Sequence, residues 1–427
     1  MLPRHVLNST CAMASLFAAV AISAPVRAQT STSIELYGFA MADGIYDTKR
    51  VDPNWQDAFR PSKIGVHDEF GSNGQSSISV KQSRFGVQGS MPVEDHAPIN
   101  FKFEFDFFGV GVDEGQTTIR LRHFYGEWGQ ILAGQTHSLF MDIDVFPNVI
   151  DYWGPPGMVF YRLPQLRWTP FRSDKSHFAI ALERPGNDID PGQLREIDPG
   201  LGENLRADEE LIDFTAQYYT SGDWGHFQIA GILRRVGFDT INTPDHEPQG
   251  HRTGWGVDIS GHYKLFEKDK LIGSVVVGQG IASYMNDGGV DLAADGIPAR
   301  PAQTIVPGPQ GLFPPQALLL PAADASARPK AVPLLGVMAY LDHYWSDKWS
   351  SSIGYSFTRV DNTNLQDPSA FREGEYASVN LLYTPASNVM IGGEVMWGQR
   401  TNHDRASGDD VRFQISVKYN FSTKFNL

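Results

Sequence analysis

Cysteine is almost missing from this sequence: Cys11 is the only one in 427 residues. No disulfide can form within one chain, so a cysteine-rich scaffold and paired-thiol redox chemistry are both excluded. Long apolar runs are missing too, since no stretch approaches the roughly 20 consecutive apolar residues that a membrane-spanning helix needs. Helical periodicity is nearly absent. These absences exclude a disulfide-stabilised secreted domain and a bundle of transmembrane helices.

Basic residues are also scarce. Lysine and arginine together number 35 against 49 acidic residues, which gives a net charge of -14. Without Arg4 and Arg27, both in the first 28 residues, 33 basic residues remain and the net charge becomes -16. Such an acidic chain is a poor partner for nucleic acid.

The first residues have the features of a secretory signal peptide. A weakly basic start precedes an apolar stretch at 12–22, and small residues surround a cleavage site after Ala28. An apolar core of this length is too short to span a membrane, which is typical of a cleaved signal. The sequence therefore predicts a signal peptide at 1–28 and one mature domain at 29–427.

Motifs of enzymatic chemistry are missing as well. The sequence contains no GxSxG, HExxH or GxxxxGK[ST] pattern, and its twelve histidines lack metal-ligand spacing. The groups His67-Asp68-Glu69 and His403-Asp404 fall in predicted loops, where we interpret them as solvated polar residues. We therefore predict no catalytic residue, no cofactor and no metal site.

Strict alternation of apolar and polar residues is abundant instead. In the closing stretch 411–427, VRFQISVKYNFSTKFNL, the odd positions are apolar except for Thr423 and the even positions are polar. The stretch 98–109 alternates in the same way and places four phenylalanines on one face. Successive side chains of a strand point to opposite faces, so each stretch lies between two unlike environments.

The number of alternating stretches is even, which suits a closed antiparallel barrel. Short turns between them are interleaved with long segments, as in outer-membrane barrels, which have short periplasmic turns and long external loops. The longest segment, 286–330, is rich in Pro, Ala and Gly, and predicts an external loop without regular structure. Sixteen strands are predicted, at 34–46, 76–90, 98–109, 117–128, 130–138, 158–170, 175–184, 210–220, 225–238, 253–266, 270–285, 331–346, 349–360, 373–384, 388–400 and 409–421.

A soluble all-β protein is the alternative, because its strands alternate too. Many of the predicted strands have eleven or more residues, against about 5 to 6 in soluble sheets. Aromatic residues such as Trp128, Trp224, Tyr344 and Trp397 cluster at strand ends, as in the girdles of membrane barrels. Both features favour a 16-stranded antiparallel transmembrane β-barrel.

If the apolar faces meet lipid, the polar faces line the lumen, and they carry many basic residues. Guanidiniums in a water-filled constriction attract carboxylates and phosphates at any relevant pH. We therefore expect a preference for anions. An alternative stays open, in which Glu104, Asp106, Glu183 and Glu394 pair with the arginines and only stabilise the wall. The predicted lumenal basic residues include Arg84, Lys102, Arg120, Arg122, Arg167, Lys264, Arg412 and Lys418.

Segment 136–157, THSLFMDIDVFPNVIDYWGPPG, is too long and too apolar for an ordinary exposed loop. The lumen could cover its apolar residues, so we predict a loop that folds inward and narrows the barrel. Its carboxylates, Asp142, Asp144 and Asp151, would then lie opposite the arginines, beside Tyr152 and Trp153. The alternative is that the loop packs outside against a neighbouring subunit.

Several local patterns resemble a known family. SRFGVQG at 83–89 resembles the second-strand motif of general porins from Gram-negative bacteria. LRHFYGEWGQILAGQTHSLFMD at 121–142, YWGP at 152–155 and RLPQLRWTPF at 162–171 resemble the DcaP-like trimeric porins. The resemblance covers essentially the whole chain after residue 28.

The resemblance implies a homotrimer in the outer membrane, surrounded by lipid and lipopolysaccharide, through which small anions, particularly dicarboxylates, diffuse passively. It implies that 136–157 is the inward-folded third loop. Arg162 has the wrong strand parity for the lumen, and six residues follow Phe421, where strands of this kind often end. The arginine wall implied by the resemblance is Arg84, Arg120, Arg122, Arg162 and Arg167.

We thus predict an outer-membrane porin for small anionic solutes. The alternatives are a porin for neutral solutes such as sugars and, from other classes, a barrel enzyme or an adhesin. The closing stretch leaves its own question open. Either the last strand projects past the periplasmic rim, or it pauses at Phe421 and the final six residues pair elsewhere.

Overall fold

The computed structural model describes residues 31–109, 118–193, 204–241, 249–297, 303–305, 318–320 and 326–427. The predicted signal peptide, 1–28, lies outside the described residues. None of the helices in these ranges is long and apolar enough to cross a membrane.

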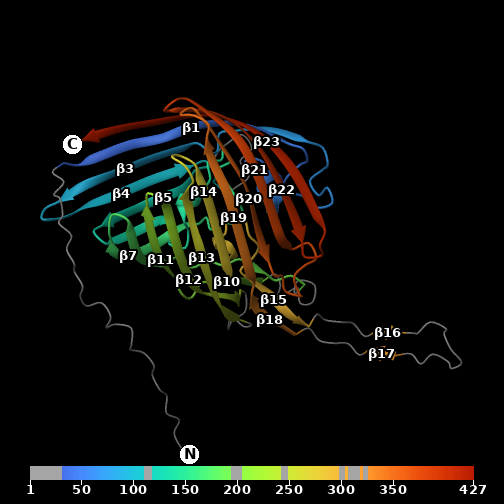
Figure 1. Cartoon of the computed structure of the whole chain (residues 1–427). Helices are drawn as coiled ribbons and strands as arrows, with labels where there is room; N and C mark the ends of the chain where they lie inside the picture. The colour runs from blue at the N-terminus through green and yellow to red at the C-terminus, as the bar shows by residue number, and fades with distance from the viewer. Residues whose placement is uncertain are drawn as a thin grey trace, which may run out of the picture.

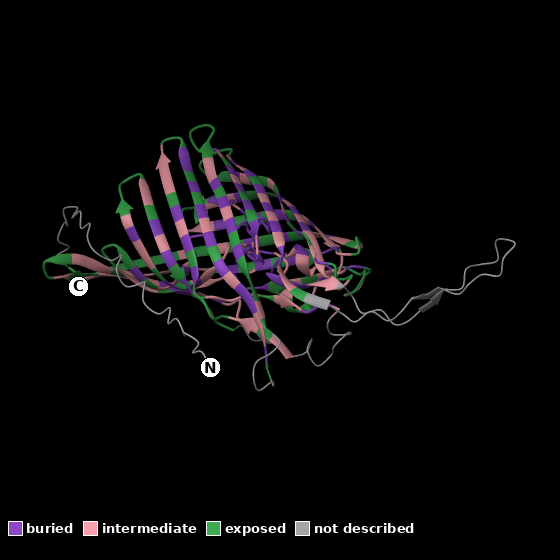
Figure 2. Ribbon diagram, turned by 90° about the horizontal axis from the view of Figure 1, so that it is seen from below, coloured by how far each residue is buried: buried purple, intermediate pink, exposed green. Residues whose placement is uncertain are grey.

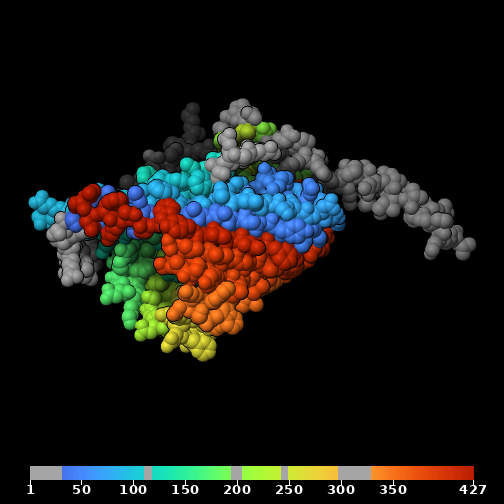
Figure 3. All heavy atoms as spheres, turned by 90° about the horizontal axis from the view of Figure 1, so that it is seen from above, coloured from blue at the N-terminus to red at the C-terminus, as the bar shows by residue number. Residues whose placement is uncertain are grey.

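Eighteen of the described strands form a closed antiparallel barrel (Figure 1). β1 (Ser33–Asp47) closes it by pairing with both β3 (Arg84–Val93) and β23 (Ser407–Asn426). Figure 3 shows the first strand, in blue, beside the last strand, in red, on the barrel surface. Each other wall strand pairs with its neighbours in the sequence.

Two wall strands are interrupted. β2 (Gln75–Ser79) and β3 both pair with β1, while β10 (Leu205–Asp208) and β11 (Asp213–Gly222) both pair with β12 (Gly225–Thr240). The eighteen segments of the sheet therefore make sixteen wall strands, as the sequence predicts. The remaining wall strands are β4 (His96–Asp106), β5 (Arg120–Trp128), β6 (Ile131–His137), β7 (Arg162–Arg172), β8 (Ser176–Glu183), β13 (Gly250–Lys264), β14 (Lys270–Gln279), β19 (Pro333–Tyr344), β20 (Trp349–Val360), β21 (Phe371–Ala386) and β22 (Val389–Asn402).

Alternation along β23 separates the two faces of the wall. Ile415 is 65% exposed on the outer surface, whereas Arg412 and Ser416 are completely buried. Figure 2 shows the same banding of buried and exposed residues along the neighbouring strands. The apolar face is thus the outer, lipid-facing one, and the polar face points into the lumen.

β23 does not pause at Phe421. It continues to Asn426 and stays paired with β1, with Thr423 opposite Leu36 and Phe425 opposite Ile34. All residues from Phe421 to Leu427 are exposed. The closing strand therefore projects past the rim, because β1 offers it backbone partners from Arg412 to Asn426.

The prediction for 270–285 is wrong at its end. β14 stops at Gln279, and Gly280, with φ of +64°, turns the chain into the lumen. The apolar residues that continue the pattern, Ile281 and Tyr284, are fully buried inside the barrel. An inward loop with the 3-10 helix η4 (Ala282–Tyr284) thus stands where a strand was expected.

The segment 286–330 is not free of regular structure. β15 (Leu292–Ile297) pairs with β18 (Ser326–Ala331) and, in parallel, with β9 (Ile189–Asp190). β16 (Gln303–Ile305) and β17 (Leu318–Leu320) form a further antiparallel pair. The composition of this segment, which is rich in Pro and Gly, does not predict these backbone pairings.

The hydrophobic core lies inside the barrel, where loops pack on the inner wall. The first long loop contributes two 3-10 helices, η1 (Pro53–Trp55) and η2 (Pro61–Lys63), and the third contributes η3 (Ile143–Val145). Loop residues such as Phe59, Val145 and Met158 pack against Tyr340 and Tyr376 of the wall. The barrel is thus partly filled, which restricts the route open to a solute.

Candidate solute passage

The third loop folds into the lumen, as its apolar content predicts. Its start is bound by Glu183, whose carboxylate accepts from Ser138 Oγ at 2.8 Å and from the Leu139 amide at 2.9 Å. Farther along, the Ile150 amide donates to Glu394 at 2.8 Å. At Gly157 a Cβ would lie 2.3 Å from the carbonyl oxygen of Val337, so this position has no room for a side chain. The loop is packed on the inner wall and not outside the barrel.

Two other loops join it. Arg60 of the first loop donates to Asp287 from Nε at 3.0 Å and from Nη2 at 2.8 Å, and Asp287 follows η4. Asn286 donates from Nδ2 to the carbonyl oxygen of Trp153 at 2.6 Å, which ties the same segment to the third loop. Asp151 accepts from the Phe59 amide at 2.7 Å. Three inward loops thus form one hydrogen-bonded body.

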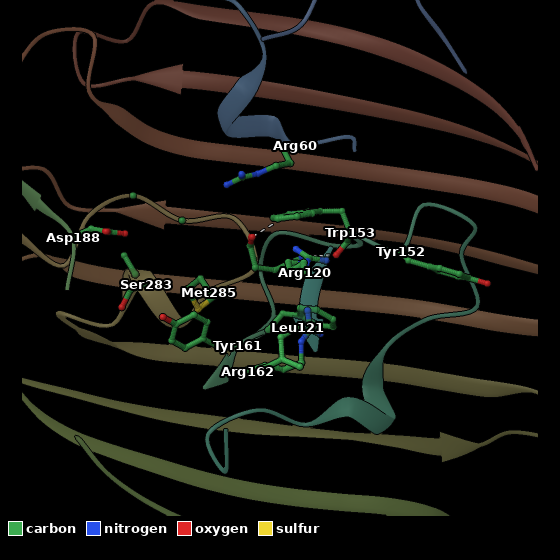
Figure 4. Close-up of a pocket in the computed structure, with 15 residues that line it drawn as sticks. Arg60, Arg120, Leu121, Tyr152, Trp153, Tyr161, Arg162, Asp188, Ser283 and Met285 are labelled. Atoms are coloured by element: carbon green, nitrogen blue, oxygen red, sulfur yellow. Dashed lines mark hydrogen bonds between the residues drawn. The ribbon is translucent and has the colours of Figure 1, made fainter. Parts of the chain in front are cut away.

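A cavity of about 450 Å³ remains beside this body (Figure 4). Three guanidiniums line it, those of Arg60, Arg120 and Arg162. Asp188 lines the same cavity and is drawn on the side away from Tyr152. The further lining residues include Tyr152, Trp153, Phe160, Tyr161, Ser283 and Asn286.

Arg120 and Arg122 are paired with carboxylates. Arg120 holds Asp106 through Nε at 2.9 Å and Nη2 at 2.6 Å. Arg122 donates from Nε to Glu104 at 2.6 Å and from Nη1 to Asp106 at 3.0 Å, and it is 4% exposed. For these two arginines the alternative holds, in which Glu104 and Asp106 pair with the basic residues of the wall.

Arg84 and Arg162 are different. Within the described residues, neither forms an ion pair with a carboxylate. Arg84 lies over the rings of Phe39 and Tyr152 at 5.3 and 5.2 Å, and Arg162 lies over Phe160 at 5.1 Å. Arg84 Nε and Arg162 Nη1 are buried without a hydrogen-bond partner. Arg162 reaches the cavity although its parity predicts an outward position, because it is the first residue of β7 and directly follows the inward loop.

The other predicted basic residues have structural partners. Arg167 donates to the carbonyl oxygen of His137 at 2.7 Å, and Lys102 lies 3.6 Å from Glu104. Arg412 binds Asp47 through Nε at 2.6 Å and Nη2 at 2.9 Å, and it is completely buried. None of these three lines the cavity.

The loop carboxylates are not arranged as expected. Asp142 and Asp144 contact His226 and Tyr219 on the wall formed by β11 and β12, instead of facing the arginines. Asp151 alone lies near a guanidinium, 3.9 Å from Arg412. Burial raises the pKa of this loop carboxyl to about 6 despite that neighbour. The positions of these carboxylates differ from the prediction because the loop crosses the lumen, and its two ends therefore contact different parts of the barrel wall.

Sequence reasoning missed Arg60, Asp188 and Asn286. All three lie in segments interpreted as external loops, whose residues carry no strand parity that would predict their direction. The first loop did contain a usable signal, since Trp55 and Phe59 are as apolar as the residues that predicted the inward third loop.

Comparison with known proteins now identifies the family. Residues 12–288 match the model of the family described as DcaP outer membrane protein. The chain belongs to the DcaP outer membrane protein family. No curated protein sequence matches it.

Solved structures show the same fold. The outer membrane channel DcaP of Acinetobacter baumannii is 20% identical, with a TM-score of 0.72 over 93% of this chain and 100% of that one. OmpT of Vibrio cholerae is 12% identical, with a TM-score of 0.52 over 93% and 100% of the two chains. OmpF of Salmonella typhi, solved with daunomycin, is 11% identical, with a TM-score of 0.51 over 91% and 97%.

Membership of the DcaP family settles class and location. The protein is an outer-membrane porin with a 16-stranded barrel, as the sequence patterns predict. It is a channel and not an enzyme, which removes the barrel-enzyme alternative.

Proposed function

We propose that this porin passes small anionic solutes, dicarboxylates among them, along the wall formed by β3, β5 and β7. The observation that carries the proposal is the pair of partly buried arginines Arg84 and Arg162, whose guanidiniums have no carboxylate partner among the described residues. Arg60 and Arg120 line the adjoining cavity.

Charge balance supports an anion as the solute. Among the described ion pairs, Arg120 and Arg122 share Glu104 and Asp106, and Arg84 and Arg162 add two further charges that have no paired carboxylate. An arginine removed from bulk water is costly unless it is compensated. At ~5 Å and an effective dielectric constant of ~20, one solute carboxylate gains ~3 kcal/mol from each such guanidinium. Two uncompensated cations offer one partner to each end of a short diacid.

The cavity also has polarity across its width. Asp188 lines it together with the arginines, in a loop outside the membrane-spanning strands. Burial and the neighbouring Asp291 raise the pKa of Asp188. A carboxylate on one side and guanidiniums on the other produce a transverse field that orients charged solutes.

Neutral solutes such as sugars are a second candidate. Trp153 and Tyr161 line the cavity with Asn286, and such aromatic and amide groups suit a sugar ring. This candidate predicts transport that is independent of solute charge.

We further propose that the protein is a homotrimer. OmpT of Vibrio cholerae, a structural match with a TM-score of 0.51, is described in a trimer form. The outer face of β3 to β5 exposes a contiguous set of rings in which Phe103 contacts Phe105 and Phe124 at 5.9 and 5.8 Å. Migration in detergent gels with and without heating tests this assembly.

Reversal potentials across planar bilayers in a KCl gradient test the anion proposal. We expect anion selectivity in the wild type and a clear loss of it in Arg84→Ala combined with Arg162→Ala. Arg359→Ala is the matched control, because Arg359 is half exposed and bound to Glu373 on the outer surface. Cation selectivity of the wild type, or identical potentials for the double variant and the wild type, would contradict the proposal. Liposome swelling with diacids and sugars of similar size separates the two candidates.

A further inference from the structure

A second cluster of side chains lies where the third loop meets the opposite wall. Asp142 and Asp144 of the loop approach His226 of β12, and one donor atom from each of the three lies within 4.8 Å of the others. His226 Nε2 is 2.8 Å from Asp142 Oδ2. The side chains of these two residues are 0% and 2% exposed, while Asp144 is exposed.

The donor set suits a divalent transition metal. Zinc takes imidazole nitrogen and carboxylate oxygen at ~2.0–2.2 Å in a tetrahedral arrangement, so two of its ligand atoms lie ~3.4 Å apart. His226 Nε2 and Asp142 Oδ2 are 2.8 Å apart, so they would need to separate by only ~0.6 Å to admit an ion. Three protein ligands with one of them exposed leave positions for water.

Outer-shell partners already orient the three donors. His226 Nδ1 lies 2.6 Å from His262 Nδ1, so a single proton is shared between the rings. When His226 donates that proton, its Nε2 lone pair points at the carboxylates. Ser260 Oγ donates to Asp142 at 2.8 Å, and Tyr219 donates to Asp144 at 3.1 Å. Metal-bound histidines typically have such a partner on the second ring nitrogen.

The cluster also lacks a permanent positive charge. Among the described ion pairs, no lysine or arginine lies within 4 Å of Asp142 or Asp144, and His226 is the only basic partner. Asp258 is buried on the adjacent strand β13, where its carboxyl group accepts from Ser274 Oγ at 2.9 Å. A bound cation would balance the charges of Asp142 and Asp144.

We propose that Asp142, Asp144 and His226 bind one divalent transition-metal ion, with zinc as the best match, and that the ion fastens the third loop to the barrel wall. The site goes beyond the proposed anion transport and is independent of which solute passes. Local sequence patterns do not indicate this site, because His226 is more than 80 positions from the two aspartates.

Calorimetry on the full chain in detergent, freed of metal with a chelator, tests the site with Zn²⁺, and Co²⁺ absorption reports the ligand geometry. We expect one ion per chain in the wild type and no saturable binding in Asp144→Asn or His226→Gln. His262→Gln should weaken binding by about 10–100-fold through its outer-shell role. His96→Gln, at the exposed first residue of β4, is the matched control and should bind as the wild type does.

Absence of saturable Zn²⁺ binding in the wild type would overturn the proposal. Undiminished binding in Asp144→Asn would do the same, and this partly solvated loop position avoids a dependence on the buried His226 variant for correct folding. Open-channel current noise tests the fastening: Zn²⁺ should lower it in the wild type and not in Asp144→Asn. Unchanged noise upon binding would refute the fastening. Reversal potentials measured in the same channels report separately on anion selectivity.

Discussion

Asp287 joins the first long loop to the inward loop that contains η4. It is 1% exposed and accepts from Arg60 Nε and Nη2, from the Ser62 amide at 2.8 Å and from Ser62 Oγ. Asp287→Ala would leave the Arg60 guanidinium, which is itself largely buried between Trp55 and Trp153, without its carboxylate.

Removing one partner of a buried ion pair costs about 3–5 kcal/mol. We expect the lower end, about 3 kcal/mol, because Arg60 keeps its two ring contacts and lines the cavity. Local opening of the first loop should then become about 100-fold more frequent, since 1.4 kcal/mol corresponds to a factor of ten.

Trypsin reports this opening at Lys63, the last residue of η2. The bond after Lys63 lies inside the barrel, so cleavage requires the loop to leave the lumen, and its rate follows the open population when reclosing is fast. We expect cleavage about 100-fold faster in Asp287→Ala. Asp347→Asn is the control, because Asp347 pairs with Lys268 in an exposed turn and has no contact with the loop. Equal rates for Asp287→Ala and wild type would refute the reasoning.

Three further predictions concern other parts of the chain. Because the pKa of Asp151 is raised to about 6 in the fold, docking of the third loop should be strongest below about pH 4 and weaken as the pH rises through 6. Open-channel noise should therefore increase across that window in the wild type and stay flat in Asp151→Asn; a slope that persists in the variant would assign it to another group. Mass spectrometry of the protein from outer membranes should give a first residue of Gln29, and a mass that includes residues 1–28 would contradict the predicted signal peptide. Gly157→Ala should destabilise the docked loop, since a Cβ has no space beside the carbonyl oxygen of Val337, and a melting temperature equal to that of the wild type would show that the wall yields.

The sequence predicted the wall well because a membrane barrel imposes one rule on every strand. Lipid requires an apolar outer face and the lumen a polar inner one, so parity alone placed Arg412 inward and Ile415 outward. The prediction failed where that rule stops. Beyond Gln279 the apolar residues continue, but they face the packed lumen instead of lipid, and alternation does not distinguish the two.

The residues that line the solute passage were harder to predict from the sequence than the strands of the wall. Parity identified Arg84, Arg120 and Arg122 as inward, yet it did not show that Glu104 and Asp106 neutralise two of them and leave Arg84 unpaired. Strand parity did not predict the orientation of Arg60, because the orientation of a side chain in a loop is set by contacts such as the one with Asp287.

The sequence by itself determined the barrel, the polarity of its two faces and the inward course of the third loop, because these follow from local alternation and from the need to bury apolar residues. Tertiary structure alone decided which charges remain free and which loops meet. Ion pairs such as Arg60 with Asp287 join residues 227 positions apart, and no local pattern records whether two distant charges come within hydrogen-bonding distance.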